Sequence, residues 1–316
     1  MCSLFGLIDY ENAVPSFARK VIVKILAQEC EARGTDATGI AYNTHGSLRV
    51  YKRPVRAAKF RFNLPSDSHV IMGHTRMTTK GNQKVNNNNH PFYGSVPDNV
   101  FALAHNGVLY NDEQLRSQMQ LPNTTIETDS YVAVQLLERI GHISFESLKE
   151  MSETVSGSFC FSILTDENDV YLVKGSNPLA IYDCGGFYVY ASTKEILDKA
   201  LKRLHIRKKS EVQSSQGDIL KISANGSIER SKFNCYDYEY SRYSFLSSYI
   251  GRDRDDADEL DLIIQYASYF GIDERDIIML SDMGYDACDI EEMLYDPVGM
   301  QTVINEYRDL MVCDIG

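Results

Sequence analysis

The sequence predicts an α+β protein in which mostly antiparallel sheets stack on each other with helices packed outside them, followed by a small acidic all-α extension. Three observations support this prediction. Segments with the pattern of strands outnumber those with the pattern of helices, and many form hairpin-like pairs. Acidic residues concentrate after residue 235, where the apolar pattern becomes helical. Neither a G-x-G-x-x-G nor a Walker motif occurs, which disfavours a nucleotide-binding parallel sheet.

Short apolar runs between turn-forming residues predict the strands, and apolar residues at helical spacing predict the helices. The predicted strands are residues 3–10, 39–42, 48–52, 68–73, 99–105, 158–165, 170–174, 187–190 and 218–222. The predicted helices of the first part are residues 17–33, 130–140 and 194–204. We expect Gly34 to cap the first helix at its C-terminus, and Thr128 or Asp129 to cap the second at its N-terminus. Residues 80–99 are rich in Asn, Gly and Pro and predict a long loop.

The charge is unevenly placed along the chain. Residues 236–316 hold twenty acidic residues and five Arg, whereas the whole chain has a net charge of only -12. We therefore expect a domain over residues 2–235 and an acidic helical module over 236–316, with helices at 258–270, 274–283, 287–294 and 298–310. The module is either a solvated helical extension or a docking surface for a basic partner. Its charge disfavours binding to nucleic acid, whose phosphates it would repel.

Composition also restricts the compartment. No run approaches eighteen apolar residues, so no transmembrane helix is expected, and the first residues lack the basic segment of a signal peptide. The seven cysteines are odd in number and contain no C-x-x-C pair. A disulfide framework and a thiolate zinc site are therefore disfavoured, and a reducing cytoplasm is the expected compartment. The histidines share no ligand spacing, so we expect neither a metal nor a cofactor.

Cys2 is the first candidate for chemistry. Removal of Met1 would make Cys2 the N-terminal residue, with its thiol and a free α-amino group on one residue. The pKa of an α-amino group is about 8, so a useful fraction is neutral near pH 7 and can accept the thiol proton. On its position alone, Cys2 is more often a small apolar residue buried in the first strand.

Four further residues have a functional and a structural interpretation. Arg76 at a strand end can grip a carboxylate with its planar guanidinium, or can lie on the surface. Asn106 and Gly107 can supply the two N–H donors of an oxyanion hole, or can form a turn at a strand end. Asp129 can pair with a substrate ammonium, or can cap the following helix.

Taken together, these segments resemble the class II glutamine amidotransferase domain of the Ntn-hydrolase superfamily, which has an N-terminal cysteine. The resemblance covers roughly residues 2–225, and the short motifs follow the family's order and spacing. They are Met1-Cys2 with Phe5-Gly6, Arg33-Gly34-Thr35-Asp36-Ala37-Thr38-Gly39, Gly73-His74-Thr75-Arg76, His90-Pro91, His105-Asn106-Gly107, Thr128-Asp129-Ser130, Ser156-Gly157-Ser158-Phe159, Gly175-Ser176-Asn177-Pro178-Leu179 and Tyr190-Ala191-Ser192.

The resemblance implies a four-layer αββα sandwich and a role for each candidate residue. Cys2 attacks the side-chain amide carbon of glutamine, with its own α-amino group as base. Asn106 and the Gly107 N–H stabilise the oxyanion. A γ-glutamyl thioester forms, and water releases glutamate. Arg76 holds the α-carboxylate of glutamine, and Asp129 holds its α-ammonium.

The chain departs from the family pattern around the loop that closes over glutamine. Met77 follows the arginine where the family often has Trp. Shortly afterwards the family often has Thr-His-Gly, and this chain has Thr79-Lys80-Gly81 in that place. Phe92 follows His90-Pro91 where another His is frequent. Thr79 and His90 remain candidate residues of the substrate pocket, although each can instead hydrogen-bond within the loop.

The partner and the biological role remain open at this stage. The roughly 80 residues after 235 are too few for the family's ammonia-using domains, so we expect glutamine as the substrate and a separate synthase or other ammonia acceptor as a possible protein partner. Two alternatives are an Ntn hydrolase for another amide and a non-catalytic glutamine sensor or interaction module that works through its acidic tail. Arg76 and Asp129 favour a free amino acid over a simple amide, because together they read both of its ends.

Overall fold

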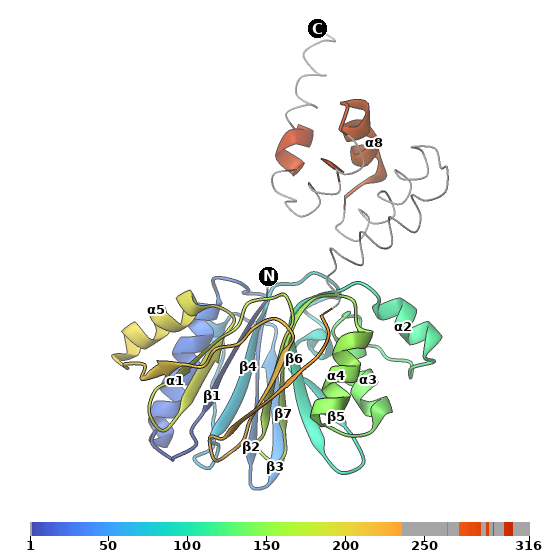
Figure 1. Cartoon of the computed structure of the whole chain (residues 1–316). Helices are drawn as coiled ribbons and strands as arrows, with labels where there is room; N and C mark the ends of the chain where they lie inside the picture. Colours follow the sequence, from blue (N-terminus) through green and yellow to red (C-terminus); the bar gives the residue numbers. More distant parts are fainter. Residues whose placement is uncertain are drawn as a thin grey trace. The chain divides into compact units, whose positions relative to one another are not determined.

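The computed structural model describes residues 2–235, 264, 272–285, 289–290, 293 and 300–305 (Figure 1). The chain divides into two compact units, Met1–Tyr236 and Asp237–Gly316. Over the described ranges, no helix is long and apolar enough to cross a membrane.

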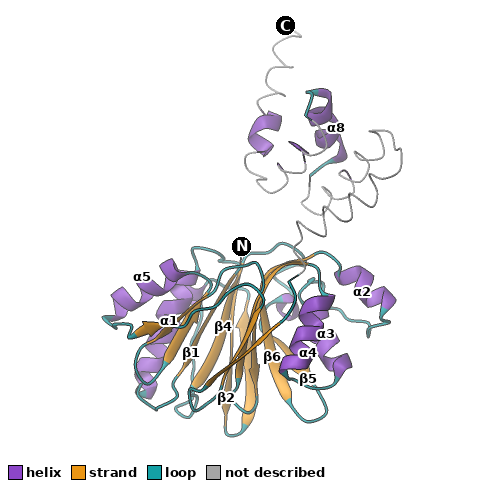
Figure 2. Cartoon of the chain, viewed as in Figure 1, coloured by secondary structure: helices purple, strands orange, loops and turns teal. Residues whose placement is uncertain are grey.

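Two sheets form the centre of the first unit, and every strand pair in them is antiparallel (Figure 2). The seven-stranded sheet has the order β11 (Ser210–Glu211), β9 (Ala180–Asp183), β10 (Tyr188–Ala191), β1 (Ser3–Ile8), β4 (Val70–Arg76), β2 (Ala37–Thr44) and β3 (Ser47–Arg53). The six-stranded sheet has the order β13 (Ile228–Lys232), β12 (Asp218–Ile222), β8 (Val170–Lys174), β7 (Gly157–Thr165), β6 (Val100–Leu109) and β5 (Phe92–Ser95).

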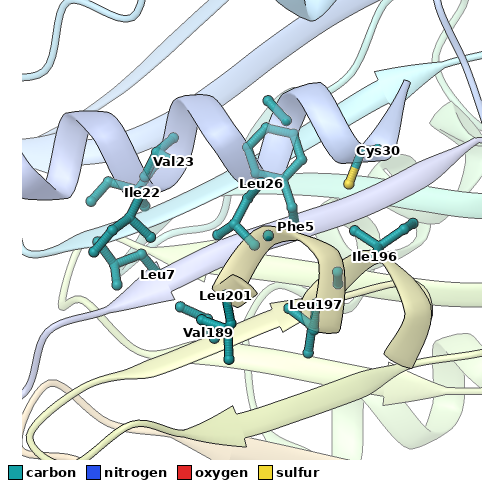
Figure 3. Close-up of a cluster of buried hydrophobic side chains, with 14 of the residues drawn as sticks. Phe5, Leu7, Ile22, Val23, Leu26, Cys30, Val189, Ile196, Leu197 and Leu201 are labelled. Carbon is teal, nitrogen blue, oxygen red and sulfur yellow. The ribbon is translucent and has the colours of Figure 1, made fainter. Parts of the chain in front are cut away.

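Helices cover the outer face of each sheet. Helices α1 (Ser16–Cys30) and α5 (Lys194–Leu204) pack on the seven-stranded sheet through a buried apolar cluster, part of which Figure 3 shows. In that cluster Leu26 and Leu197 lie with Phe5 of the sheet. Helices α3 (Tyr131–Ile140) and α4 (Phe145–Thr154) share a second buried cluster with the six-stranded sheet. The short α2 (Asp112–Gln118) precedes them, and two 3-10 turns, η1 (Ala57–Lys59) and η2 (Asn86–Asn88), complete the unit.

A third cluster fills the space between the sheets, which makes the unit a four-layer αββα sandwich. Leu4 and Met72 from one sheet share this cluster with Ala104 and Leu172 from the other. Every residue of β1 is buried, because alternate side chains face the helices and the second sheet. This explains the continuous apolar run at the start of the sequence. The predicted α+β class and layer order are confirmed.

Gly34 does not cap the first helix as predicted. The helix ends at Cys30, and the C-cap residue Glu31 keeps right-handed helical dihedral angles. A Cβ atom at Gly34 would lie 2.5 Å from the Arg76 carbonyl carbon, so glycine is required here for a close approach of two backbones. The predicted cap of the 130–140 helix is also wrong, since the N-cap of α3 is Ser130 and makes no side-chain cap hydrogen bond.

The expected loop at 80–99 is partly ordered into secondary structure. It contains η2 and strand β5, which pairs with β6 from Phe92↔Leu103 to Ser95↔Val100. Helices α2 and α4 and the short strands β9, β11 and β13 are not predicted by the sequence pattern. The hairpin of β2 and β3 was expected, and its turn places His45 and Gly46 at positive φ.

The second unit has a small apolar core of its own. Helix α8 (Glu274–Asp282) lies within the predicted helix 274–283 and contributes Ile277 and Leu280 to this core. Its other buried members are Ile290, Met300 and Ile304. Most residues of the predicted helices 258–270, 287–294 and 298–310 lie outside the described residues.

Candidate active site

Cys2 lies immediately before strand β1 and is held through its backbone. The Arg33 Nε–H donates to the Cys2 carbonyl at 3.0 Å, and the Cys2 thiol donates to the Met77 carbonyl at 3.4 Å. Burial raises the pKa of the Cys2 thiol, while the Met77 hydrogen bond and the positive charge of Arg76 oppose that rise. The thiol therefore needs a base before it can act as a nucleophile.

Arg76 is the last residue of β4, the strand beside β1. Because Ser3 pairs with Thr75, the next register position brings Cys2 and Arg76 side by side at the sheet end. The buried Arg76 guanidinium donates from Nη1 to the Asn89 side-chain oxygen at 2.8 Å. Its Nη2 donates to the carbonyls of Lys80, at 2.5 Å, and Gly81. A guanidinium has five N–H donors, so these contacts do not exhaust it.

The Arg76 contacts show that residues 77–89, which we call the site loop, fold around the guanidinium. Three acidic side chains outside the loop hold it in this position. Asp36 accepts from the Thr78 N–H at 2.7 Å, Glu127 accepts from the Asn82 N–H at 2.9 Å, and Asp112 forms an ion pair with Lys80 at 3.1 Å. The loop thus folds closely over Arg76.

Asn106 and Gly107 lie within a paired strand rather than at its end. Strand β6 continues through Leu109, and Gly107 pairs with Phe159 of β7, so the predicted strand end at residue 105 and the turn interpretation of Asn106-Gly107 are both wrong. Gly107 has φ of +148°, and a Cβ atom there would lie 1.9 Å from the Ser158 carbonyl oxygen. Only glycine fits, because this conformation and this close approach both exclude a side chain.

Two residues from distant parts of the chain hold Asn106. The Asn177 side-chain amide donates to the Asn106 carbonyl at 2.8 Å. The Asn106 Nδ2 donates to the Ser192 hydroxyl at 3.3 Å, and that hydroxyl also accepts the Leu4 N–H at 2.8 Å. Ser192 therefore links Asn106 in one sheet to a residue two positions after Cys2 in the other.

Asp129 precedes α3 and is buried. Its Oδ2 accepts the Leu109 N–H at 2.6 Å, and its Oδ1 accepts the Ser130 hydroxyl at 3.4 Å. The same Ser130 hydroxyl lies 2.8 Å from Nδ1 of His105. Asp129 acts on the Cys2 thiol and on Arg76 through its charge, so the three side chains lie within electrostatic range of one another.

The remaining two candidates lie in different environments. Thr79 is exposed on the site loop. His90 is buried, with its ring centroid 4.2 Å from that of His74 and 4.4 Å from that of Phe92. Both of its ring nitrogens lack a hydrogen-bond partner among the described residues, and burial lowers the pKa of His90 well below its ordinary value.

Several residues that contact the site carry no local sequence signal of that role. Arg33, Asp36, Asn177 and Ser192 stand in the quoted motifs, but their contacts with Cys2, the site loop and Asn106 join segments far apart in the chain. No sequence signal short of the family motifs could have found them. Within the described part of the chain, no group of three or more His, Cys, Asp or Glu side chains could hold a metal ion.

Known proteins share both the sequence and the fold of this unit. Residues 74–199 match the family model of a glutamine amidotransferase domain. The chain is 33% identical over 201 residues to glutamine–fructose-6-phosphate aminotransferase (isomerizing) of Staphylococcus aureus, which covers 61% of this chain and 32% of that protein. The Staphylococcus epidermidis protein of the same name is 32% identical over 203 residues, with the same coverage. The chain thus spans about a third of the length of these relatives.

Two solved structures have the same fold. The glutamine phosphoribosylpyrophosphate amidotransferase of Bacillus subtilis superposes with a TM-score of 0.58 at 24% identity, over 73% of this chain and 49% of that chain. A structure described as the allosteric regulatory enzyme of purine biosynthesis gives 0.59 at 23% identity, with the same coverage. The sequence matches and this fold agree with the order of the motifs and with the position of Cys2 at the head of β1. The first unit therefore contains a glutamine amidotransferase domain that is homologous to the class II enzymes of the N-terminal-nucleophile type.

Proposed function

We propose that this chain hydrolyses the side-chain amide of glutamine to glutamate and ammonia, with Cys2 as the nucleophile. The observation that carries the proposal is the β1–β4 register, which places Cys2 beside Arg76 at one end of the sheet, with the Asp129 carboxylate within electrostatic range of both. A guanidinium and a carboxylate are the groups that bind the two charged ends of a free amino acid. A thiol beside them can reach that amino acid's side chain.

The first chemical step transfers one proton and forms one bond. Removal of Met1 frees the Cys2 α-amino group, which accepts the thiol proton as the sulfur attacks the amide carbon of glutamine. The Asn106 side-chain N–H and the Gly107 N–H donate to the resulting oxyanion. When the tetrahedral intermediate collapses, the C–N bond of the amide breaks, and the protonated α-amino group of Cys2 returns the proton to the departing ammonia.

The second step regenerates the enzyme. Water adds to the γ-glutamyl thioester with the α-amino group again as base, and the C–S bond breaks to release glutamate and the Cys2 thiol. The buried thiol has a raised pKa, so the base has to act at the moment of attack. This requirement supports a base on the same residue, because no side chain has to move toward the sulfur.

The site loop holds the Arg76 guanidinium in place for glutamine. Arg76 donates to Asn89 and to two loop carbonyls, and its remaining N–H donors can bind the α-carboxylate of the substrate. We infer that Thr79, which is exposed on the same loop, contacts the bound glutamine. Asp129 uses Oδ2 for the Leu109 N–H and Oδ1 for the Ser130 hydroxyl, and a second lone pair of Oδ1 can accept from the α-ammonium of glutamine. His90 lines the pocket from its buried position near Arg76.

The ammonia released at this site is expected to be used by a second protein. We propose that residues 2–235 form the glutaminase domain, that residues 236–316 form an appended acidic module, and that a separate synthase or another ammonia-acceptor protein is the physiological partner. No cofactor is required for the glutaminase step, because the thiol, the α-amino group and the amide donors supply all of its chemistry.

A steady-state assay of glutamate release tests the proposal. The wild-type chain should release glutamate and ammonia from glutamine in equal amounts, and Cys2→Ala should reduce turnover to background. Cys184→Ala is the matched control, because Cys184 belongs to the helix-covered side of the seven-stranded sheet and should leave turnover unchanged. Binding of glutamine without turnover in the processed wild-type chain would contradict the proposal and favour a sensor.

A further inference from the structure

The side-chain amide of Asn106 is only half satisfied. Its Nδ2 donates to the Ser192 hydroxyl, while its Oδ1 is buried and has no hydrogen-bond partner among the described residues. A buried carbonyl oxygen without a donor is unfavourable. It is also the wrong group for an oxyanion hole, because an acceptor repels the developing negative charge.

The Ser192 hydroxyl can resolve this mismatch. Ser192 follows β10, and its backbone N–H donates to the Leu4 carbonyl at 3.1 Å while its Oγ accepts the Leu4 N–H at 2.8 Å. Ser192 is fully buried in this position. A hydroxyl has one hydrogen to donate as well as two lone pairs. With Leu4 as its donor, Ser192 still has that hydrogen to give.

We propose that Ser192 is a positioning residue that fixes the orientation of the Asn106 amide, with the Ser192 hydroxyl donating to Oδ1 and with Nδ2 turned away from it toward the reacting carbonyl. The two orientations differ by a half-turn of the amide and occupy almost the same space. The proposed orientation pairs both Oδ1 and the Ser192 hydrogen. In this orientation Nδ2 has no acceptor within the described residues, and it donates to the oxyanion when the tetrahedral intermediate forms.

Hydrogen bonds fix the backbone around Asn106. The orientation of its side-chain amide therefore has to be set by a further contact. Asn177 donates to the Asn106 carbonyl, and its Nδ2 would lie 2.6 Å from a Cβ at Gly107, which places it directly against this backbone. The second oxyanion donor, the Gly107 N–H, is therefore set by β6 and Asn177. Ser192 sets the first donor, and it ties that donor to β1, the strand that follows Cys2. This inference rests on the proposed glutaminase function.

Kinetics of Ser192→Ala test the inference. We expect kcat for glutamine to fall about 10- to 100-fold, somewhat less than for loss of an oxyanion donor itself, with KM changed less than about twofold. Alkylation of Cys2 by iodoacetamide forms a C–S bond without an oxyanion, so its rate should stay within about twofold of wild type. Ser192→Thr keeps the hydroxyl and should restore most of kcat. In the Asn106→Ala background, Ser192→Ala should have no further effect on kcat.

Three kinetic results would overturn the inference. The first is a Ser192→Ala enzyme with wild-type kcat. The second is an equal loss of kcat in the presence and absence of the Asn106 side chain. The third is a parallel loss of alkylation rate, which would mean that Ser192 merely holds β1 in place through Leu4.

Neutron diffraction of deuterium-exchanged wild-type protein tests the same inference without turnover. Deuterons on the Asn106 side-chain atom that faces away from Ser192, with a deuteron on Ser192 Oγ directed at Asn106, would support it. Deuterons on the atom that faces Ser192 would overturn it. Absence of glutamine turnover in the wild-type chain would instead contradict the proposed function, and the neutron map would still decide the amide orientation.

Discussion

The Lys80 ammonium lies 3.1 Å from both carboxylate oxygens of Asp112, and this ion pair fastens the site loop to the first residue of α2. The carbonyl of the same lysine accepts a hydrogen bond from Arg76. Glu113, the next residue of α2, adds a second carboxylate at 3.0 Å from the ammonium. Lys80 thus joins the guanidinium expected to bind glutamine to a helix outside the sheet sandwich.

We predict that Lys80→Met raises KM for glutamine about fivefold and changes kcat little. The lysine is partly exposed, so its pairing with Asp112 is worth about 1 kcal/mol, and losing it lowers the fraction of molecules with a closed site loop. The KM difference from wild type should shrink in 1 M NaCl, because salt screens the pair. The control is Lys84→Met, at an exposed lysine of the same loop whose ammonium forms no ion pair with any described residue. Equal KM values for the two variants would contradict the prediction.

Gly34→Ala should be strongly destabilising. A Cβ atom there would lie 2.5 Å from the Arg76 carbonyl carbon and 2.7 Å from the Met77 nitrogen, and neither backbone atom can move without shifting the end of β4. We expect the free energy of unfolding in urea to fall by about 3 kcal/mol, and glutamine turnover to fall with it. Gly141→Ala is the comparison, since a Cβ at Gly141 meets open space and costs only the strain of its positive φ, about 1 kcal/mol. Similar losses in both variants would show that no close approach constrains Gly34.

Stability should fall as the pH drops below about 6.5, because two buried histidines stay neutral in the folded chain. Burial lowers the pKa of His74 to about 3, and it lowers the pKa of His90 well below its ordinary value. Below pH 6.5 these two histidines become protonated in the unfolded chain but stay neutral in the folded chain. Each ring therefore lowers the free energy of unfolding by about 1.4 kcal/mol for every pH unit until its folded pKa is reached.

His90→Leu isolates one of these contributions. Urea unfolding between pH 6 and pH 4.5 should show a slope about 1.4 kcal/mol per pH unit shallower than that of wild type. Between pH 7.5 and pH 8.5 the two proteins should have parallel profiles, since both rings are then neutral in either state. An unchanged slope at low pH would mean that His90 is protonated in the folded chain. Glutamine KM measured on the same variant tests the proposed contribution of His90 to the pocket.

Much of the fold could be predicted because its central elements are buried on both faces. The run at 3–8 is apolar throughout, since β1 lies between the helices and the second sheet, and the predicted bounds of β8, α5 and β12 match the structure. The missed α2 and α4 carry many polar residues, which weakened their helical pattern. Strand β5 was hidden because it follows an Asn-rich stretch that favours a loop.

The errors around glycine have a common physical origin. Gly34 and Gly107 both stand where a Cβ atom would collide with another backbone segment, at Arg76 and at Ser158. The sequence shows only that a glycine is present, and a helix cap or a turn is the commonest local reason for one. The partners of these glycines lie about 40 and 50 positions away, so local patterns could not reveal them.

The candidate catalytic and substrate-binding residues could be predicted from the sequence, but the residues that orient them could not. The motifs identified Cys2, Arg76, Asn106 and Asp129. The residues that orient them include Ser192 and Asn177, which lie in the loops after β10 and β8 and act through single hydrogen bonds. The closure of the site loop on Arg76 also depends on contacts that only the folded chain brings together.

The most direct test of the account is the intact mass of the full chain before and after exposure to a chloroketone analogue of glutamine, with and without excess glutamine. The account predicts a chain that lacks Met1 and gains one label, which peptide mapping places on Cys2 and which glutamine but not asparagine blocks. Cys2→Ala should remain unlabelled. A chain that retains Met1, a label on another cysteine, or labelling that ignores glutamine would contradict the claim that Cys2 is the nucleophile of a glutamine site.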